Sequence, residues 1–590
     1  MRNVRFHLIG TFLLIIGFTT SWGEAAPSSA PDSSGQTVYF PLMMKPTEGL
    51  RVSQVRVLQG SSLSGGYAVY LADRETLVRV FVDTADGKSV SEVTGRLCGY
   101  DALGQTLGCM PADNGTIMAP STEEALQSTL NFHLPIAWTK PGFNYHVDMD
   151  PADLDPNTAS GSARFPSSGK QAIDFVEAPK LDVVVVPVEY RPSENSQTFI
   201  PVTDDLSYLT YLPIKLFPVP AVDYQTHALY TYVPSSSSKN LDRVDGWVNL
   251  LEDITALHNM ENSSGSKHFY GLVNLYEAHG CNGGCITGIG WLGGIGAHKT
   301  AVGWSGFGAG NAAASETMVH EMGHNFNRKH VACSGKETNI DEDYPYPNGV
   351  IGQFGVDVSG GKLYQPDDYS DYMSYCDPTW TSDYTYWNIY HYRRNTATTV
   401  QLNSEAVEAS YISGIIAPDG AVTLQPVYSQ RTPVPAIGSG SFTLQLLDVD
   451  GRESSVYSFN PYEIADSGGY RGFGLFVPSV EDLGGLRVFH DDQILAERYA
   501  QDIVERLDVK ESSLAIDRSA AALQLEWSLE SEQVLAYRLR FSQDGGKTWQ
   551  VLALDWRDSE FRLPLELNRG LLEIQATDGL NTSTKVITID

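Results

Sequence analysis

The spacing of apolar residues divides the chain into a central region of alternating strands and helices and flanking regions of short strands. An almost unbroken apolar run at 181–187 predicts a strand that is buried on both faces. Residues 242–258 repeat apolar side chains with a helical period and predict an amphipathic helix. A strand at 268–276 and a short helix at 312–327 follow, so we expect an α/β domain over residues 180–402.

The two flanks show short runs of alternating apolar and polar residues, separated by Gly, Asp and Asn. With 590 residues the chain is too long for one core, so several domains are expected. We expect a β-sandwich at 38–179, a second at 403–505, and an immunoglobulin- or fibronectin-III-like domain at 506–590. Within the last domain, residues 542–549 (SQDGGKTW) resemble an Asp-box hairpin, for which we expect a packing role only.

The N-terminus has the layout of an export signal. Arg2 and Arg5 precede an apolar run at about 8–18, and small residues follow, which predicts a cleaved signal peptide at 1–26. Residues 27–37 are rich in Pro and Ser and predict a flexible leader. The apolar run is short for a bilayer span, so we expect a secreted protein without stable membrane insertion.

Net charge narrows the class of partner. The formal charge is −31 at pH 7, which disfavours nucleic acid and anionic membrane surfaces. Apolar residues make up 42% of the chain, as in ordinary globular proteins. We therefore expect protein or glycoprotein partners, and a monomer.

Six cysteines fit an oxidising compartment, where an even count predicts disulfides. Proximity along the chain favours the pairs Cys98–Cys109, Cys281–Cys285 and Cys333–Cys376. A zinc-thiolate site is the alternative, although the paired CxxC spacing of such sites is missing.

One segment of the helix at 312–327 carries a metal-binding pattern. His320 and His324 are four residues apart, so a helix presents both imidazoles on one face, with Glu321 beside them. His330 can join them only if the helix ends and the chain turns back, and Asn327 stands where a left-handed residue would be needed. Three protein ligands and one open position are typical of catalytic zinc.

This spacing resembles HExxHxxGxxH, the pattern of the metzincin zinc metalloproteases. The chain matches the three histidines and the glutamate and departs from the pattern at the glycine position, where Asn327 stands. The resemblance implies a metzincin-like α/β protease domain at 180–402. Among metzincins, the chain is most similar to large secreted bacterial enzymes of the StcE/TagA type (ToxR-regulated), which also place β domains before the protease domain. The segment also resembles adamalysins, but Val331 stands where they have Asp.

The metzincin likeness implies further site residues. A methionine turn should lie beneath the metal, and Met373 in the sequence DYMSYC is the candidate. Tyr375 follows two residues later, where related enzymes have a tyrosine that binds zinc or steadies the transition state. An edge strand for the substrate backbone should precede the zinc helix, and the glycine-rich stretch 281–310 could contain it. Cys98 could act as a latency switch, but its pairing with Cys109 is the favoured reading.

We therefore expect a secreted zinc endopeptidase that holds one zinc ion and uses Glu321 as general base. Bound calcium is left open. The alternatives are a protease directed at glycoproteins such as mucins, and a non-catalytic extracellular binding protein. Six other histidines lack ligand spacing and are expected to be surface or core residues: His227, His258, His268, His279, His298 and His391.

Overall fold

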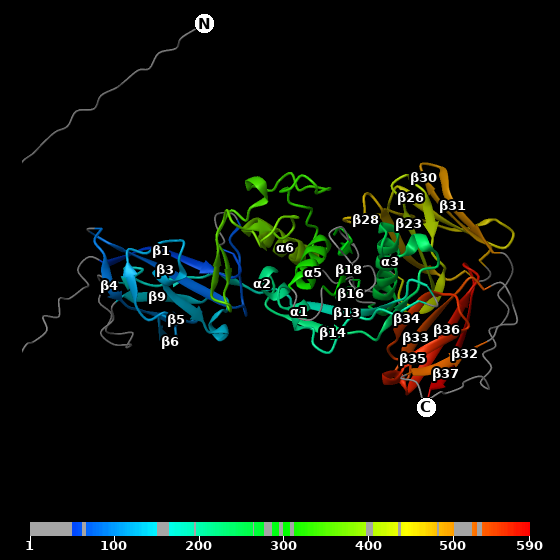
Figure 1. The fold of residues 1–590 in the computed structure, drawn as a ribbon, viewed down its shortest axis with the longest axis horizontal. Coiled ribbons are helices and arrows are strands. Elements are labelled where there is room, and N and C mark those ends of the chain that lie inside the picture. The colour runs from blue at the N-terminus through cyan, green and yellow to red at the C-terminus, as the bar shows by residue number, and fades with distance from the viewer. Residues whose placement is uncertain are drawn as a thin grey trace, which may run out of the picture. The chain divides into compact units, whose positions relative to one another are not determined.

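The structure is a computed structural model. It describes residues 50–589 except 62–66, 86, 150–163, 194–195, 263–264, 276–285, 294–298, 307–311, 397–404, 435–437, 481–482, 501–521 and 528–533. The expected signal peptide (1–26), the leader (27–37) and the pair Cys281–Cys285 lie outside these residues. None of the helices in the described part of the chain is long and apolar enough to cross a membrane. The described chain is built mostly of β-sheet with few helices, distributed over several domains (Figure 1).

The central domain is a mixed sheet in the order β14-β13-β16-β18-β17, with β15 beside the end of β13. Its strands are parallel except for β17, which runs antiparallel to β18 and forms an edge. The bounds are β13 (Leu181–Tyr190), β14 (Val222–Thr226), β15 (Tyr230–Tyr232), β16 (His268–Val273), β17 (Gly288–Gly290) and β18 (Thr300–Trp304). The helices are α1 (Ser207–Thr210), α2 (Pro213–Leu216), α3 (Val244–Glu261), α5 (Ala313–Asn325) and α6 (Asp383–Thr396).

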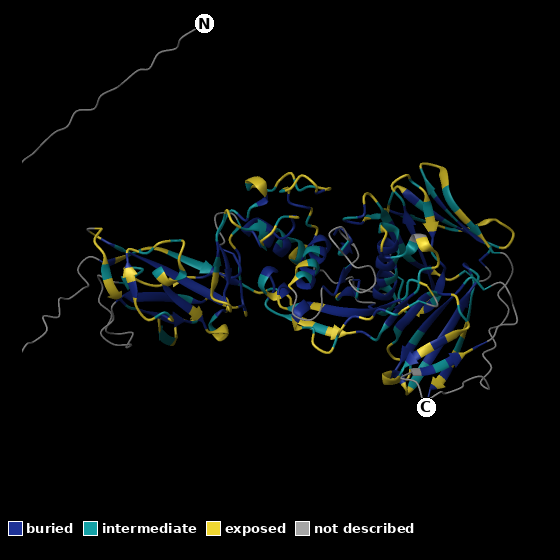
Figure 2. Ribbon diagram, in the orientation of Figure 1, coloured by how far each residue is buried: buried dark blue, intermediate teal, exposed yellow. Residues whose placement is uncertain are grey.

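The apolar run of β13 is explained by helices on both faces of the sheet. Val184, with alternate residues beyond it, packs in one hydrophobic cluster with Trp247 of α3. Val183 and Val185 face a second cluster that contains Met318 of α5. Because side chains alternate along a strand, burial on both faces requires a continuous apolar sequence. Figure 2 shows the strands of this sheet mainly in the colour of buried residues.

The sequence predicted these elements with small errors at their ends. The strand expected at 181–187 continues to Tyr190, and the strand expected at 268–276 ends at Val273. The helix expected at 242–258 is α3, Val244–Glu261, and the one expected at 312–327 is α5, Ala313–Asn325.

The N-terminal β domain contains two main sheets around its own hydrophobic core. One sheet has the order β1-β3-β8 and the other β10-β9-β5-β6, with β11 beside β9. The disulfide Cys98–Cys109 joins paired residues of β5 and β6. The bounds are β1 (Leu50–Leu58), β3 (Thr76–Thr84), β5 (Gly95–Tyr100), β6 (Thr106–Pro111), β8 (Leu130–Leu134), β9 (Asn144–Met149), β10 (Arg164–Phe165) and β11 (Gln171–Ala172); short pairs are β2 (Tyr70–Leu71) with β12 (Phe175–Val176) and β4 (Val90–Val93) with β7 (Ile117–Ala119).

The C-terminal part consists of two further two-sheet units with separate cores. The first has the sheets β24-β23-β29-β28, with β25 beside β23, and β27-β26-β30-β31; the second has β32-β35 and β34-β33-β36-β37. The bounds are β23 (Val407–Ile416), β24 (Val422–Leu424), β25 (Tyr428–Thr432), β26 (Phe442–Leu447), β27 (Glu453–Phe459), β28 (Tyr462–Glu463), β29 (Arg471–Pro478), β30 (Gly485–His490), β31 (Gln493–Tyr499), β32 (Ala522–Glu526), β33 (Ala536–Ser542), β34 (Gln550–Trp556), β35 (Glu560–Pro564), β36 (Gly570–Thr577) and β37 (Thr582–Ile589).

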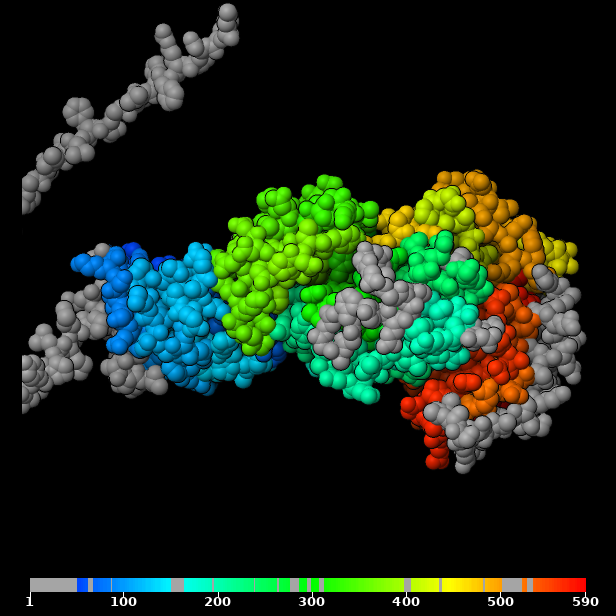
Figure 3. All heavy atoms as spheres, in the orientation of Figure 1, coloured from blue at the N-terminus to red at the C-terminus, as the bar shows by residue number. Residues whose placement is uncertain are grey.

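The first C-terminal unit shares a hydrophobic core with the central domain. Tyr411 and Phe476 of its sheet lie in one cluster with Trp247 of α3. Trp291, just after edge strand β17, is fully buried in this cluster. A side chain at Gly472 would come within 2.5 Å of the Trp291 ring, so the two backbones approach closely there. Helix α3 and strand β23 are in direct contact, and their residues can be followed by colour in Figure 3.

Candidate metal centre

Helix α5 places His320 and His324 one turn apart with their rings facing one another. Their Nε2 atoms are 3.2 Å apart. Nδ1 of His320 donates to the Tyr372 carbonyl at 2.8 Å, and Nδ1 of His324 donates to the Arg328 carbonyl at 2.7 Å. A carbonyl only accepts hydrogen bonds, so each Nδ1 carries a proton, and in its neutral form each ring presents an Nε2 lone pair. This is the tautomer that a metal ligand needs.

The helix ends in a turn that brings the third histidine back. Asn327 has φ +61°, the left-handed conformation expected for this residue. Its N–H donates to the His324 carbonyl at 2.8 Å, and the Arg328 N–H donates to the Gly323 carbonyl at 3.1 Å. This pair of bonds is a Schellman motif, which closes a helix and reverses the chain. Asn327 therefore ends helix α5 and turns the chain back, as the sequence predicts.

His330 is fully buried and is oriented by the loop that follows it. Its Nδ1 donates to the Thr338 carbonyl at 2.5 Å, so its Nε2 also presents a lone pair. Its backbone N–H donates to the Asn339 carbonyl at 3.2 Å. The predicted disulfide Cys333–Cys376 is present and joins this loop to the segment beneath the helix.

Met373 lies directly beneath helix α5 and is fully buried. Its carbonyl accepts the Val331 N–H at 3.0 Å, and its own N–H donates to the Asp371 carboxylate at 2.9 Å. An added Cβ on Gly323 would come within 2.3 Å of the Met373 sulfur. The glycine within the histidine motif therefore lets the methionine pack against the helix.

Replacing Gly323 by Ala should lower the free energy of unfolding by about 1–3 kcal/mol, the usual cost of overpacking a core. The added methyl group must push Met373 away, and the Tyr372 carbonyl that orients His320 adjoins it. Denaturant unfolding of the mature protein measures the loss. Gly438→Ala is the matched control, because no atom lies within 4 Å of its added Cβ. Equal stability of the two variants would contradict this packing role.

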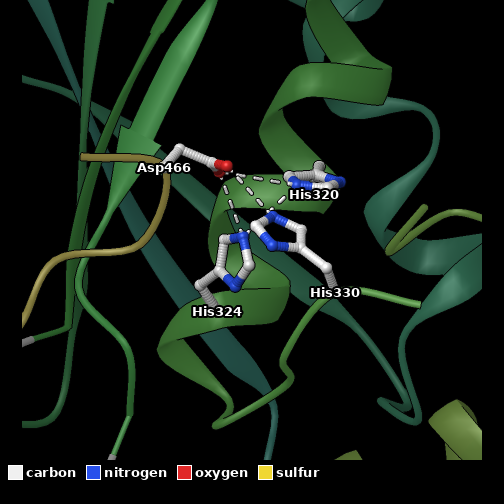
Figure 4. A group of neighbouring side chains, drawn as sticks. All are labelled: His320, His324, His330 and Asp466. Atoms are coloured by element: carbon white, nitrogen blue, oxygen red, sulfur yellow. Dashed lines mark hydrogen bonds and ion pairs between the residues drawn. The ribbon is translucent and has the colours of Figure 1, made fainter. Parts of the chain in front are cut away.

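Asp466 is the site residue that the sequence analysis missed. It lies in the loop between β28 and β29 of the first C-terminal unit, and its carboxylate points at the three imidazoles (Figure 4). Its oxygens are 3.0 Å from Nε2 of His330, 3.3 Å from Nε2 of His324 and 3.7 Å from Nε2 of His320. No local spacing in the sequence connects this aspartate to the histidine motif.

These four side chains form a donor set that fits a divalent cation. Three lone pairs and a carboxylate converge, with their ligand atoms within 4.8 Å of one another. A tetrahedral site with zinc–ligand distances near 2.0–2.1 Å has ligand–ligand separations of about 3.3 Å. The separations of 3.0–3.7 Å around Asp466 and of 3.2 Å between His320 and His324 match this value. The residues present therefore fit zinc.

Protonation of the histidines would not pair all the Nε2 atoms and carboxylate oxygens of this cluster. Burial lowers the pKa of His330, but the Asp466 carboxylate raises it by more, so this pKa lies above its ordinary value. Burial lowers the pKa of His324 to about 4, which keeps that ring neutral near neutral pH. A proton on His330 would still leave the facing nitrogens of His320 and His324 without a hydrogen between them. A shared cation satisfies all of them at once.

Glu321 is buried beside this set, with 4% of its surface exposed. Its Oε2 atom has no hydrogen-bond partner. A Cβ at Gly288 would come within 2.5 Å of the Glu321 Oε1 atom, and one at Gly290 would come within 3.4 Å of its Oε2 atom. Strand β17 therefore has glycines at the two positions beside the Glu321 carboxylate, where a side chain would crowd it. Burial raises the pKa of Glu321, and the negative charge of Asp466 raises it further.

Tyr375 lies beside the three histidines and is 46% exposed. Its hydroxyl is 3.2 Å from Nε2 of His330 and donates to the Asp466 carboxylate. Burial of the hydroxyl raises the pKa of Tyr375, and Asp466 adds to this effect, so the phenol stays protonated. The structure thus brings Tyr375 to the same place as the three histidines.

The remaining candidates lie elsewhere. His227 binds the Glu261 carboxylate at 3.0 Å, and His258 and His268 are buried by the central sheet, so none of them joins the centre. His391 packs on the Trp387 ring in α6, and His279 and His298 lie outside the described residues. Cys98 is bonded to Cys109, so the structure does not use it as a switch at the metal centre.

Comparisons with known proteins do not group this chain with a family. No family model matches it, and no curated protein matches it. Among solved structures, a two-domain fibronectin type-III segment from chicken tenascin is 12% identical and covers 31% of this chain and 95% of its own, with a TM-score of 0.13. A β-1,2-glucanase from Parabacteroides distasonis is 14% identical over 31% of this chain and 28% of its own, at 0.12. A Parabacteroides merdae β-glucuronidase is 10% identical over 92% and 78%, at 0.13. TM-scores this low carry no argument about chemistry.

Proposed function

We propose that this protein is a secreted zinc-dependent endopeptidase of the metzincin type. Three imidazoles, from His320, His324 and His330, converge in a geometry that fits zinc. The observation that carries the proposal is Glu321, a buried carboxylate beside them whose Oε2 has no hydrogen-bond partner. A purely structural zinc needs no such group, whereas peptide hydrolysis needs a base beside the metal.

The chemistry follows from the positions of the chain's own groups. Zinc, when bound, supplies a Lewis acid that lowers the pKa of water and polarises a carbonyl. Glu321 accepts a proton from the attacking water and donates it to the departing amine nitrogen. Burial raises the pKa of Glu321, and the nearby Asp466 carboxylate raises it further, which favours the uptake of a proton by this carboxylate. The Tyr375 hydroxyl stays protonated and can donate a hydrogen bond to the developing oxyanion.

The substrate backbone has a place at the edge of the central sheet. Strand β17 is the last strand of the sheet order, pairs there with β18, and lies against Glu321. An exposed sheet edge binds an extended peptide through main-chain hydrogen bonds. The expectation of an edge strand within the glycine-rich stretch 281–310 is consistent with this position. A peptide on β17 would thus lie next to the general base.

The main alternative is a non-catalytic extracellular binding protein with a structural metal. The specific observation in its favour is Asp466, because a fourth protein ligand closes the coordination sphere as in structural sites. The buried, unpartnered carboxylate of Glu321 favours the peptidase. A preference for mucin-type glycoproteins rests only on the likeness to enzymes of the StcE/TagA type. Relative cleavage of casein and mucin would separate a general peptidase from a mucin-directed one.

Metal analysis together with proteolysis tests the proposal. We expect about one zinc per chain in the purified mature protein, from the three-histidine site. Cleavage of casein should stop when a chelator is added and resume when zinc is restored. A protein that holds no zinc, or whose cleavage survives zinc removal, would overturn the proposal.

A further inference from the structure

A segment of the chain itself, Glu463–Ala465, pairs with the C-terminal end of the proposed substrate edge of the central sheet. The Leu292 N–H donates to the Glu463 carbonyl, and the Ala465 N–H donates to the Gly290 carbonyl, both at 2.9 Å. Trp291 and Ile464 form an antiparallel bridge between these two bonds. The segment therefore pairs with residues 290–292, at the C-terminal end of β17 and on the side away from β18. Sheet edges bind extended peptides in the same way.

The same segment is firmly anchored by side chains. Ile464 is 5% exposed and belongs to the hydrophobic cluster that contains Trp291. The Ser467 hydroxyl donates to the Ile464 carbonyl at 2.7 Å and accepts the Tyr470 N–H at 3.0 Å, which closes the loop. The Tyr470 hydroxyl donates to Asp245 of helix α3. The loop is thus tied to the central domain on both sides of Asp466.

Asp466 follows this segment immediately and enters the metal centre. Its φ of +57° turns the chain at this point. Its carboxylate then lies 3.0–3.7 Å from the three Nε2 atoms and accepts a hydrogen bond from Tyr375. A catalytic zinc keeps one position open for the nucleophile, and a fourth protein ligand fills that position. A zinc ion on the three histidines would thus share the Asp466 carboxylate with the Tyr375 hydroxyl.

We propose that Asp466 is a fourth zinc ligand and that residues 463–466 are an intramolecular inhibitor carried by the first C-terminal unit. This rests on the proposed function. The segment fills the open metal position with Asp466, and it occupies the end of the sheet edge next to the metal centre, where the substrate backbone would bind. The structure thus corresponds to a latent enzyme, and a peptide substrate gains access when this segment leaves the edge.

Asp466→Gly in the mature, zinc-loaded protein tests the inference. Glycine accepts a positive φ without strain, so the loop keeps its backbone while the ligand is lost. The matched control is Asp492→Gly, at an exposed aspartate with φ +64° in the turn between β30 and β31. The readouts are the affinity for acetohydroxamic acid, a small zinc-binding probe, by calorimetry, and the rate of peptide cleavage.

We expect Asp466→Gly to bind the hydroxamate at least about tenfold more tightly than the unaltered protein, since affinity scales with the fraction of open sites. Cleavage should rise by a similar factor, and Asp492→Gly should match the unaltered protein in both. Equal hydroxamate affinity in all three proteins overturns the role of Asp466 as an inhibitor. The proposed peptidase function then stands, provided that cleavage still depends on Glu321. Tighter hydroxamate binding without any cleavage supports the ligand role and overturns the peptidase. Absence of zinc from all three proteins overturns both.

Discussion

Replacing Glu321 by Gln will remove peptide cleavage and leave zinc bound. General base catalysis contributes about 10²–10⁴-fold, and a neutral amide cannot accept the proton of the attacking water. The substitution keeps the size of a side chain that fits against Gly288 and Gly290, so the fold should persist. The initial rate of casein cleavage and the zinc content of the same sample are the two measurements.

Glu321→Gln is made both in the unaltered chain and in the Asp466→Gly variant, so that latency of the unaltered chain does not hide the loss of cleavage. Glu316→Gln is the control, because Glu316 lies on the first turn of the same helix and is exposed. It should cleave at the rate of its parent. If Glu321→Gln cleaves as fast as Glu316→Gln, the assignment of the base is wrong.

Replacing His330 by Ala should remove stable zinc binding. Outer partners of metal ligands already change metal affinity by about 10–100-fold, and loss of a ligand should exceed this range. The histidine is fully buried and its Nε2 lies 3.0 Å from Asp466, so water replaces it poorly. Zinc affinity is measured by competition with a chromophoric chelator.

Thermal unfolding tests zinc binding by His330→Ala independently. A ligand that binds only the folded state raises the unfolding temperature, so added zinc should stabilise the unaltered protein and not His330→Ala. His391→Ala is the control, since His391 packs on Trp387 in α6, away from the centre. Zinc affinity of His330→Ala equal to that of His391→Ala would exclude His330 as a ligand.

Local sequence patterns predicted the central elements well because each depends on near neighbours. The apolar run of β13 reflects burial on both faces, and the helical period of α3 reflects its packed side. In α5, the four-residue spacing alone places His320 and His324 on one face. Asparagine tolerates a left-handed backbone, so the sequence predicts a turn at Asn327, and this residue has φ +61°. Two of the three expected disulfides, Cys98–Cys109 and Cys333–Cys376, were confirmed.

Contacts between distant segments could not be predicted in this way. The packing of Gly323 on Met373 depends on two segments meeting across the core. The sequence predicts the place of Met373 but not the need for a glycine at position 323. Asp466 went unnoticed, because an aspartate in a loop between short strands has no pattern that distinguishes it from the other acidic residues.

The sequence by itself determined the chemistry that the centre can support: three imidazoles, one adjacent carboxylate and a turn that joins them. Helical periodicity and backbone preference are local properties, so a single chain reveals them. Only the tertiary structure decided what occupies the fourth position and the free edge of β17. That outcome depends on the shared core between the first C-terminal unit and α3, which holds Ile464 against Trp291 and thereby directs Asp466 to the histidines.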